Sequence, residues 1–216
     1  MRLRLLLLFL IGLAVALVIV KTWQTDALYQ MKLAQQSAAD AVAPEGAVVL
    51  LGDSIIEGLA ASAVAPGALN FGISGDASRD LLKRLGRYSS LAKARAIFLE
   101  IGINDLLHVT HDDVIANYGR ILAALPRQPR LYLIGILPID EKAFVAAYGD
   151  LATNAEIARI NIAVRELCRQ RGNCVPLQPF GAGGLPPEYH IGDGLHLSEA
   201  GYKALTAALR AALARP

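Results

Sequence analysis

Short apolar runs recur along the chain and alternate with longer segments in which apolar residues follow helical spacing. The runs contain many β-branched residues, so we expect strands over 47–51, 68–73, 96–101, 131–137 and 174–177. The helical spacing predicts helices over roughly 80–90, 112–125, 154–171 and 198–213. Strands that alternate with helices form βαβ units. The pattern therefore predicts an α/β fold, with a five-stranded parallel sheet between two helical layers.

The first residues of the chain show a different pattern. Two arginines precede an uncharged run over 5–20, which Lys21 and Trp23 close. Sixteen such residues rise about 24 Å as a helix, against roughly 30 Å for the hydrocarbon core of a membrane. Snorkelling of Arg4 and Lys21, with Trp23 at the interface, makes up the difference. The pattern predicts a transmembrane anchor over 1–23.

The anchor would be single-pass, because the arginines on its N-terminal flank place that end in the cytoplasm and the remainder outside. A cleaved signal peptide and a secreted product are the alternative. Cleavage favours small residues directly after the apolar run, whereas Lys-Thr-Trp follows it here. We therefore favour a membrane-anchored chain on the periplasmic side.

The predicted anchor is followed by a stretch without Gly or Pro over 22–43, which ends at Pro44. Its Ala, Gln, Leu and Met residues favour helix. We expect three parts along the chain: the anchor or signal over 1–23, a helical stalk or linker over 24–46, and one folded domain over 47–216.

Charge narrows the class of partner. The 216 residues include 21 Lys and Arg and 19 Asp and Glu, a formal net charge of +2, with no extended basic cluster. Nucleic-acid binding is therefore not expected. The 54% hydrophobic content reflects the N-terminal segment and many alanines, so it does not indicate a polytopic membrane protein.

Polar residues directly follow the predicted strands, at the edge where ligands bind in parallel sheets. The first run, VVLLGDS, reads as a strand buried on both faces, and it ends in Gly52, Asp53 and Ser54. Ser74-Gly75-Asp76 follows the second run and Gly102-Ile103-Asn104-Asp105 the third, and Asp193 and His196 precede the last predicted helix. The sequence thus brings a serine, a glycine amide, a carboxamide and an Asp/His pair to one edge.

These residue types suit nucleophilic catalysis. A serine hydroxyl is a weak nucleophile until a base takes its proton, and His196 is the candidate base for Ser54. Asp193 lies three residues before His196, so its carboxylate can reach the other ring nitrogen. Three donors could bind an oxyanion: the backbone N–H of Ser54, that of Gly75, where a missing side chain allows close approach, and the amide of Asn104.

Four motifs, GDS, NFGISGD, GIND and DGLH, stand in an order and spacing that closely resemble the SGNH (GDSL-type) hydrolase superfamily. The Ser, Gly, Asn and His that name that family match Ser54, Gly75, Asn104 and His196, and Asp193 matches its triad acid. The residue after Ser54 is Ile, not Leu, and Asn70 with Gly72 is reminiscent of acetylhydrolase branches.

The resemblance covers about 47–213. It implies a flavodoxin-like three-layer sandwich, no metal or other cofactor, and esterase activity on acyl esters. The expected substrates are small acyl esters such as O-acetylated carbohydrate or lysophospholipid. An O-acyltransferase on cell-surface polysaccharide and a non-catalytic binding module on the same fold remain open alternatives, and so does the oligomeric state.

Other polar residues favour structural interpretations. Asp53 and Asp105 are expected to hold loops through backbone N–H groups. His108 and His111 have metal-like spacing, yet no further ligand is near and a helix start follows. His190 is the rival base to His196 but has no acid three residues upstream.

Two further features stay open at this point. Phe144 and Tyr148, after the fourth strand, could line an acyl pocket or simply pack. Cys168 and Cys174 bracket a short loop and could form a disulfide outside the cytoplasm, with buried thiols as the alternative.

Overall fold

The structure, a computed structural model, describes residues 25–107, 109–181 and 183–215. The chain divides into two units, Met1–Ala38 and Ala39–Pro216. Residues 25–41 are helical. The predicted membrane helix over 1–23 lies outside the described residues. Within the ranges given above, no helix has both the length and the apolar character needed to span a membrane.

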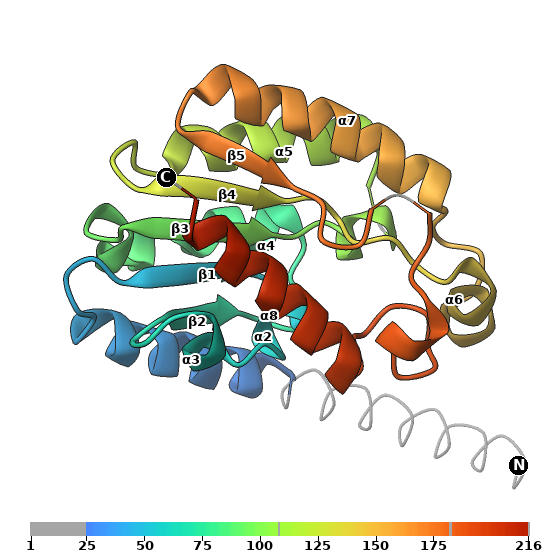
Figure 1. Ribbon diagram of the computed structural model, residues 1–216, viewed down its shortest axis with the longest axis horizontal. Helices are drawn as coiled ribbons and strands as arrows, with labels where there is room; N and C mark the ends of the chain where they lie inside the picture. Colours follow the sequence, from blue (N-terminus) through green and yellow to red (C-terminus); the bar gives the residue numbers. More distant parts are fainter. Residues whose placement is uncertain (1–24, 108, 182, 216) are drawn as a thin grey trace, which may run out of the picture. The chain divides into compact units, whose positions relative to one another are not determined.

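Five parallel strands form the sheet of the second unit, in the order β2-β1-β3-β4-β5 (Figure 1). This order is that of flavodoxin-like folds, as predicted. The strands are β1 Val48–Gly52, β2 Leu69–Gly72, β3 Ala96–Glu100, β4 Arg130–Ile134 and β5 Cys174–Leu177. Gly52 pairs with Gly72 on one side and with Glu100 on the other, so the carboxyl ends of three strands meet.

Helices cover both faces of this sheet because alternate side chains of each strand point to opposite faces. Val49 and Leu51 of β1 belong to one core, with α4, α5 and α7, whereas Val48 and Leu50 belong to the other, with α2, α3 and α8. The helices are α2 Ser54–Glu57, α3 Ala61–Val64, α4 Ser78–Arg84, α5 His111–Ala124, α6 Glu141–Tyr148, α7 Asn154–Arg171 and α8 Glu199–Leu213. The three-layer architecture predicted from the sequence is confirmed.

Some boundaries differ from the prediction. The helix expected over 80–90 begins at Ser78 and gives way after Arg84 to two 3-10 turns, Leu85–Arg87 and Ser89–Ala92. Two further 3-10 turns are Asn104–Leu107 and Pro187–Tyr189. Helix α6 was not predicted. It is short, and Asp140 begins it by accepting a hydrogen bond from the N–H of Ala143.

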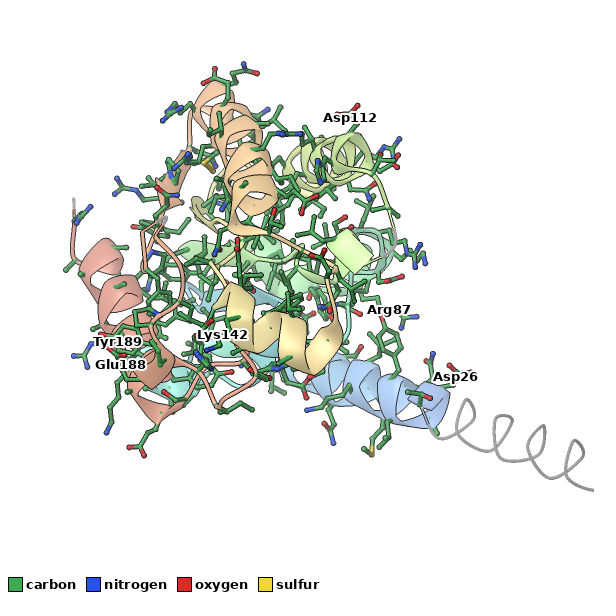
Figure 2. The ribbon with its side chains drawn as sticks, turned by 90° about the vertical axis from the view of Figure 1, so that its right-hand side faces the viewer. Asp26, Arg87, Asp112, Lys142, Glu188 and Tyr189 are labelled. Atoms are coloured by element: carbon green, nitrogen blue, oxygen red, sulfur yellow. A yellow bond between two sulfur atoms is a disulfide. The ribbon has the colours of Figure 1, made fainter. Side chains whose placement is uncertain are left out.

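Helix α6 lies beyond the carboxyl ends of the strands (Figure 1). Figure 2 views the molecule from that side, with Lys142 of α6 towards the reader. Gly194 explains how closely α6 approaches the loop before α8, since a Cβ atom there would lie 2.5 Å from both Asp140 O and Phe144 N. The unpredicted helix thus packs on the loop that carries Asp193 and His196.

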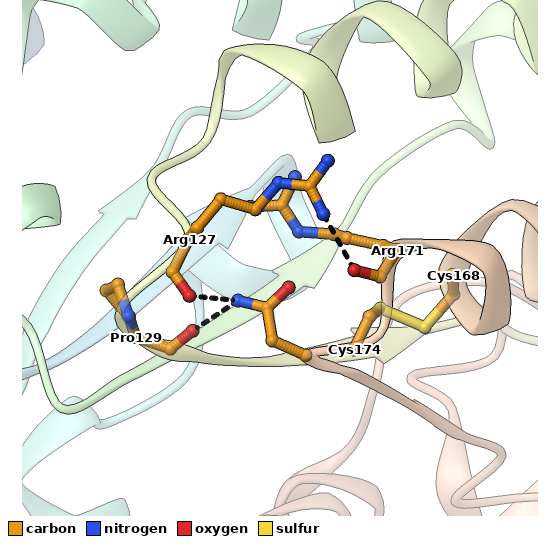
Figure 3. Close-up of a disulfide and its surroundings, with 6 residues drawn as sticks. Arg127, Pro129, Cys168, Arg171 and Cys174 are labelled. Atoms are coloured by element: carbon orange, nitrogen blue, oxygen red, sulfur yellow. Dashed lines mark hydrogen bonds between the residues drawn. A yellow bond between two sulfur atoms is a disulfide. The ribbon is translucent and has the colours of Figure 1, made fainter.

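A disulfide joins Cys168 of α7 to Cys174 of β5, with 5.2 Å between the two Cα atoms (Figure 3). Arg127 donates a hydrogen bond to Arg171 O at 2.7 Å, and Asn173 donates to the carbonyls of Arg127 and Pro129. Of the two possibilities open at the sequence level, the disulfide is therefore the one observed, and it closes the connection between helix and strand.

Candidate active site

Ser54 stands at the point where β1 turns into α2. The preceding residue, Asp53, begins the helix, because its Oδ1 accepts the N–H of Ile55 at 3.0 Å. Gly72 of β2 leaves room for this turn, since a Cβ atom there would lie 2.2 Å from Glu57 N. The turn is thus closely packed against the neighbouring strand, and it presents the Ser54 side chain half-buried at the sheet edge.

The structure brings together the three side chains that were predicted to act as nucleophile, base and orienting acid. Ser54 Oγ lies 3.1 Å from His196 Nε2, and His196 Nδ1 lies 2.7 Å from Asp193 Oδ2. The other carboxylate oxygen, Asp193 Oδ1, accepts the backbone N–H groups of Leu195 and His196 at 3.0 and 2.9 Å. The loop therefore fixes the carboxylate from one side while the imidazole binds it from the other.

Hydrogen bonding keeps the Asp193 carboxyl ionised. Burial alone would raise its pKa, but the hydrogen bonds that it accepts, first among them that from Leu195 N–H, lower the pKa to about 2. An ionised Asp193 favours the tautomer of His196 in which Nδ1 carries the proton. The Nε2 lone pair then faces Ser54, as a general base requires.

Tyr148 of α6 completes this network, a contact that no sequence pattern predicted. Its hydroxyl donates to Asp193 Oδ2 at 2.8 Å and lies 3.3 Å from His196 Nδ1. Burial, and then the bond to Asp193, raise the pKa of Tyr148 to about 12, so it remains a donor at neutral pH. Phe144, considered beside it for an acyl pocket, is instead a buried core residue.

Two of the expected oxyanion donors are backbone groups that stay available. In the described part of the chain, neither the N–H of Ser54 nor that of Gly75 donates a hydrogen bond. Gly75 has a φ of +82°, a conformation that favours glycine. A Cβ atom at Gly75 would have no neighbour within 4 Å. The glycine is therefore required by its backbone angle, and no described residue makes the close approach that was expected from the sequence.

Asn104, the third expected donor, lies at the start of the 3-10 turn after β3. Its Nδ2 donates to the carbonyl of Asp76 at 3.0 Å. This bond ties the carboxamide to the loop that contains Gly75, so the two donors are held relative to each other. An amide nitrogen carries two hydrogens, so one remains for a ligand.

A buried arginine contacts the carboxyl ends of two strands at the edge of the sheet that carries the site. Arg84 is 2% exposed; its Nε donates to Asp76 Oδ2 at 2.7 Å and its Nη2 to Gly52 O at 2.9 Å. Its Nη1 donates to Phe71 O and to the hydroxyl of Tyr88. One guanidinium group therefore joins the ends of β1 and β2 to the loop after β2, in which the Asp76 carbonyl accepts the hydrogen bond of Asn104. The only sequence signal for this role is a charged residue within a helix that packs on the sheet.

The residues given structural interpretations behave accordingly. Asp105 accepts the N–H and the hydroxyl of Ser78, at 2.7 and 2.5 Å, and Asp53 caps α2. His190 is no rival to His196. Its Nδ1 accepts the N–H groups of Gly192 and Gly194, and its ring is 5% exposed.

Of the two histidines with metal-like spacing, only His111 belongs to the described residues. His111 Nε2 lies 3.3 Å from Glu156, and His108 is outside the described residues. Over the ranges that the structure covers, no group of three or more potential ligands gathers.

Comparisons with known proteins place this geometry in context. A family model described as the GDSL-like Lipase/Acylhydrolase family matches residues 50–204. No curated protein matches the chain in sequence.

Similar solved structures share the fold. One, described as a candidate platelet activating factor from Streptococcus pneumonia, is 27% identical with a TM-score of 0.81 over 93% of this chain and 99% of its own. A lipase/acylhydrolase from Enterococcus faecalis is 22% identical, with a TM-score of 0.66 over 77% and 94%. The acetylxylan esterase Axe2 from Geobacillus stearothermophilus is 18% identical, with a TM-score of 0.60 over 80% and 97%.

Proposed function

Since the chain belongs to the GDSL-like lipase/acylhydrolase family and is a carboxylic ester hydrolase, we propose that it cleaves small acyl esters through a covalent intermediate on Ser54. One observation carries this proposal: the unbroken line of hydrogen bonds from Ser54 Oγ through His196 to Asp193, at 3.1 and 2.7 Å. Hydroxyl, imidazole and carboxylate in this arrangement form the nucleophile, base and orienting acid of acyl transfer.

The reaction follows from the positions of these groups. His196 Nε2 takes the hydroxyl proton as Ser54 Oγ attacks the ester carbonyl, and the oxyanion binds the N–H groups of Ser54 and Gly75 and the amide of Asn104. The imidazolium then protonates the leaving alcohol. Water, deprotonated by the same imidazole, attacks the acyl-enzyme and releases the acid, which restores Ser54. Asp193 stays ionised throughout and orients the ring.

We infer that the acyl group is small or only partly enclosed. The His196 side chain is 34% exposed, which indicates an open site. Acetyl esters of carbohydrate and lysophospholipids are the substrate classes proposed. A carbohydrate ester is supported by the shared fold with an acetylxylan esterase, and a lysophospholipid by the predicted membrane anchor.

We also propose that the enzyme works outside the cytoplasm, tethered by residues 1–23. The disulfide between Cys168 and Cys174 supports this placement, because disulfides persist in oxidising compartments and are rare in the cytosol. The arginines ahead of the apolar segment support the same orientation.

A panel of esters with acyl chains of increasing length tests the proposal, alongside acetylated xylooligosaccharide and lysophospholipid. We expect turnover that is highest for short acyl groups and that falls by several orders of magnitude in Ser54→Ala. A sulfonyl fluoride should add one covalent mass to the peptide LLGDSIIEG and none to the variant.

Ser62→Ala, at an exposed serine of α3, is the matched control and should retain labelling and turnover. Undiminished hydrolysis by folded Ser54→Ala would disprove the mechanism. An ester product formed with added sugar, in place of free acid, would instead assign the same residues to an O-acyltransferase.

A further inference from the structure

Two acidic side chains are buried directly behind the Ser54 turn, and no step of the proposed reaction uses them. Asp53 is 0% exposed and Glu100 is 1% exposed. Glu100 is the last residue of β3 and the register partner of Gly52 in β1, which places it beside Asp53. Because an isolated buried charge is costly, a pair of adjacent buried carboxyl groups requires an explanation.

The buried oxygens of these two carboxyl groups can find a hydrogen-bond donor in each other only if one group holds a proton. Asp53 Oδ1 accepts the N–H of Ile55. Asp53 Oδ2 and Glu100 Oε2 are both buried, and no N–H or O–H of another described residue reaches them. The two carboxyl groups interact with each other. Two ionised carboxylates offer acceptors alone, so neither could satisfy the other, whereas one proton held between them would provide a donor for the unpartnered oxygens.

No cation compensates for the pair in the described structure. Arg84, near the end of β1, already bridges Asp76 at 2.7 Å and donates to main-chain carbonyls. Tyr118 of α5 donates its hydroxyl to Ile101 O. The titratable or charged groups that face the pair from surrounding elements are Asp76, Arg84, Tyr118, His196, Tyr202 and, through Tyr202, Glu57.

Burial is the main reason why both carboxyls hold protons more tightly than usual. It raises the pKa of Asp53 to about 7 and raises that of Glu100 well above its ordinary range, where the neighbouring Asp53 charge adds to the effect. Such strongly interacting groups titrate as a unit. At neutral pH the unit therefore retains a proton that the unfolded chain would release.

We propose that Asp53 and Glu100 share one proton and form a buried acid pair that fixes the turn carrying Ser54, with Glu100 as a positioning residue acting through Asp53. The effect on catalysis rests on the proposed function, in which Ser54 is the nucleophile. The charge left on the pair would also attract the imidazolium that forms on His196, which faces Asp53.

Stability as a function of pH tests the shared proton. Between the unfolded pKa values, about 4 to 4.5, and the raised folded values, the folded chain binds more protons, so stability falls as pH rises. Each extra proton raises the unfolding equilibrium constant about tenfold per pH unit. Glu100→Gln keeps an N–H donor for Asp53 but holds no titrating proton.

Urea unfolding between about pH 6 and 8 gives the slope of the free energy of unfolding against pH. In Glu100→Gln we expect this slope to correspond to about one proton fewer, which is a factor of about ten in the unfolding equilibrium constant per pH unit. Glu166→Gln, at an exposed glutamate of α7, should keep the slope of the natural chain. Equal slopes in Glu100→Gln and the natural chain would overturn the shared proton.

Kinetics test the positioning role. Glu100→Met removes the donor and leaves Asp53 Oδ2 unpaired, so we expect kcat to fall about tenfold or more with KM nearly unchanged, whereas Glu100→Gln should stay within about threefold. The same kcat in both variants would contradict positioning. If the methionine variant does not fold, Asp53→Asn, whose amide can donate to Glu100, should also lose about one proton of slope.

The experiments distinguish a failure of the buried acid pair from a failure of the proposed function. Hydrolysis that persists in Ser54→Ala would end the esterase mechanism yet leave the proton count of the unfolding curves unaffected. A normal loss of activity in Ser54→Ala, combined with an unchanged slope in Glu100→Gln, would end the acid pair alone.

Discussion

The carboxamide of Asn104 combines a structural and a proposed catalytic task in one nitrogen. One of its hydrogens is committed to the carbonyl of Asp76 at 3.0 Å, which aims the group along the edge shared with Gly75. The other is free to bind an oxyanion. A donor held in this way costs no reorganisation when charge develops on the substrate, and this is the physical reason for the catalytic role that we propose for it.

We therefore expect Asn104→Ala to lower kcat by about 10² to 10³ with little change in KM, because the amide binds the oxyanion and not the ground-state carbonyl. Steady-state kinetics on a short acyl ester measures both constants. Asn173→Ala, which removes an asparagine that bonds two carbonyls near the disulfide, is the control and should leave kcat unchanged. A variant of Asn104 that changed KM alone would move this residue into substrate binding.

Single residues also show what sequence could and could not predict. Ser54, Asp193 and His196 were predictable as neighbours, since polar residues after strands of a parallel sheet must share one edge. Tyr148 and Glu100 were not. Tyr148 comes from a short helix without a clear pattern, and Glu100 is a single acid at the end of an apolar run, where periodicity carries no information about partners.

At the scale of elements, the buried guanidinium of Arg84 connects α4 to the strand ends. It donates to Gly52 O of β1 and Phe71 O of β2, and pairs with Asp76 in the loop between β2 and α4. The arginine is costly to bury, but each of its bonds lies inside the core, where water cannot compete. We therefore expect the arrangement of the strand ends, and with it the site, to depend on this side chain.

Arg84→Met should lower the free energy of unfolding by about 3 to 5 kcal/mol, because it removes the cation that pairs with the buried Asp76 carboxylate and the donor to the carbonyls of Gly52 and Phe71. Urea denaturation at neutral pH measures the loss. Arg169→Met, which breaks an exposed pair with Glu166, should cost no more than about 1 kcal/mol. A loss as small as that in Arg84→Met would show that the sheet edge does not depend on the buried arginine.

Element boundaries were predictable where caps or strong periodicity mark them. Thr153 and Glu156 form a capping box at the start of α7, and that helix has the bounds expected from the sequence. Helix α4 ends early at Arg84, whose side chain is buried, and the chain continues in 3-10 turns. Tertiary contacts of this kind override local helical preference, and no single-sequence pattern reports them.

For the whole molecule, the alternation of strands and helices was enough to predict the sheet and its layers, since right-handed βαβ connections leave few topologies. The predicted anchor depends on a different physical argument, the length and flanking charges of the first 23 residues, which lie outside the described structure. The disulfide of the folded unit independently supports the proposal that the domain works outside the cytoplasm.

If the chain is anchored in a membrane and its domain lies outside the cytoplasm, the full chain should remain with membranes after a salt wash. A variant that begins at residue 25 should be soluble. Hydrophobic insertion resists salt, whereas charge-mediated attachment does not. A reporter fused after Pro216 should be active outside the cytoplasm, and alkylation without reduction should label neither Cys168 nor Cys174. Release of a shortened soluble form from the full chain would establish a cleaved signal peptide. Two alkylated thiols, together with a cytoplasmic reporter, would refute the proposed location.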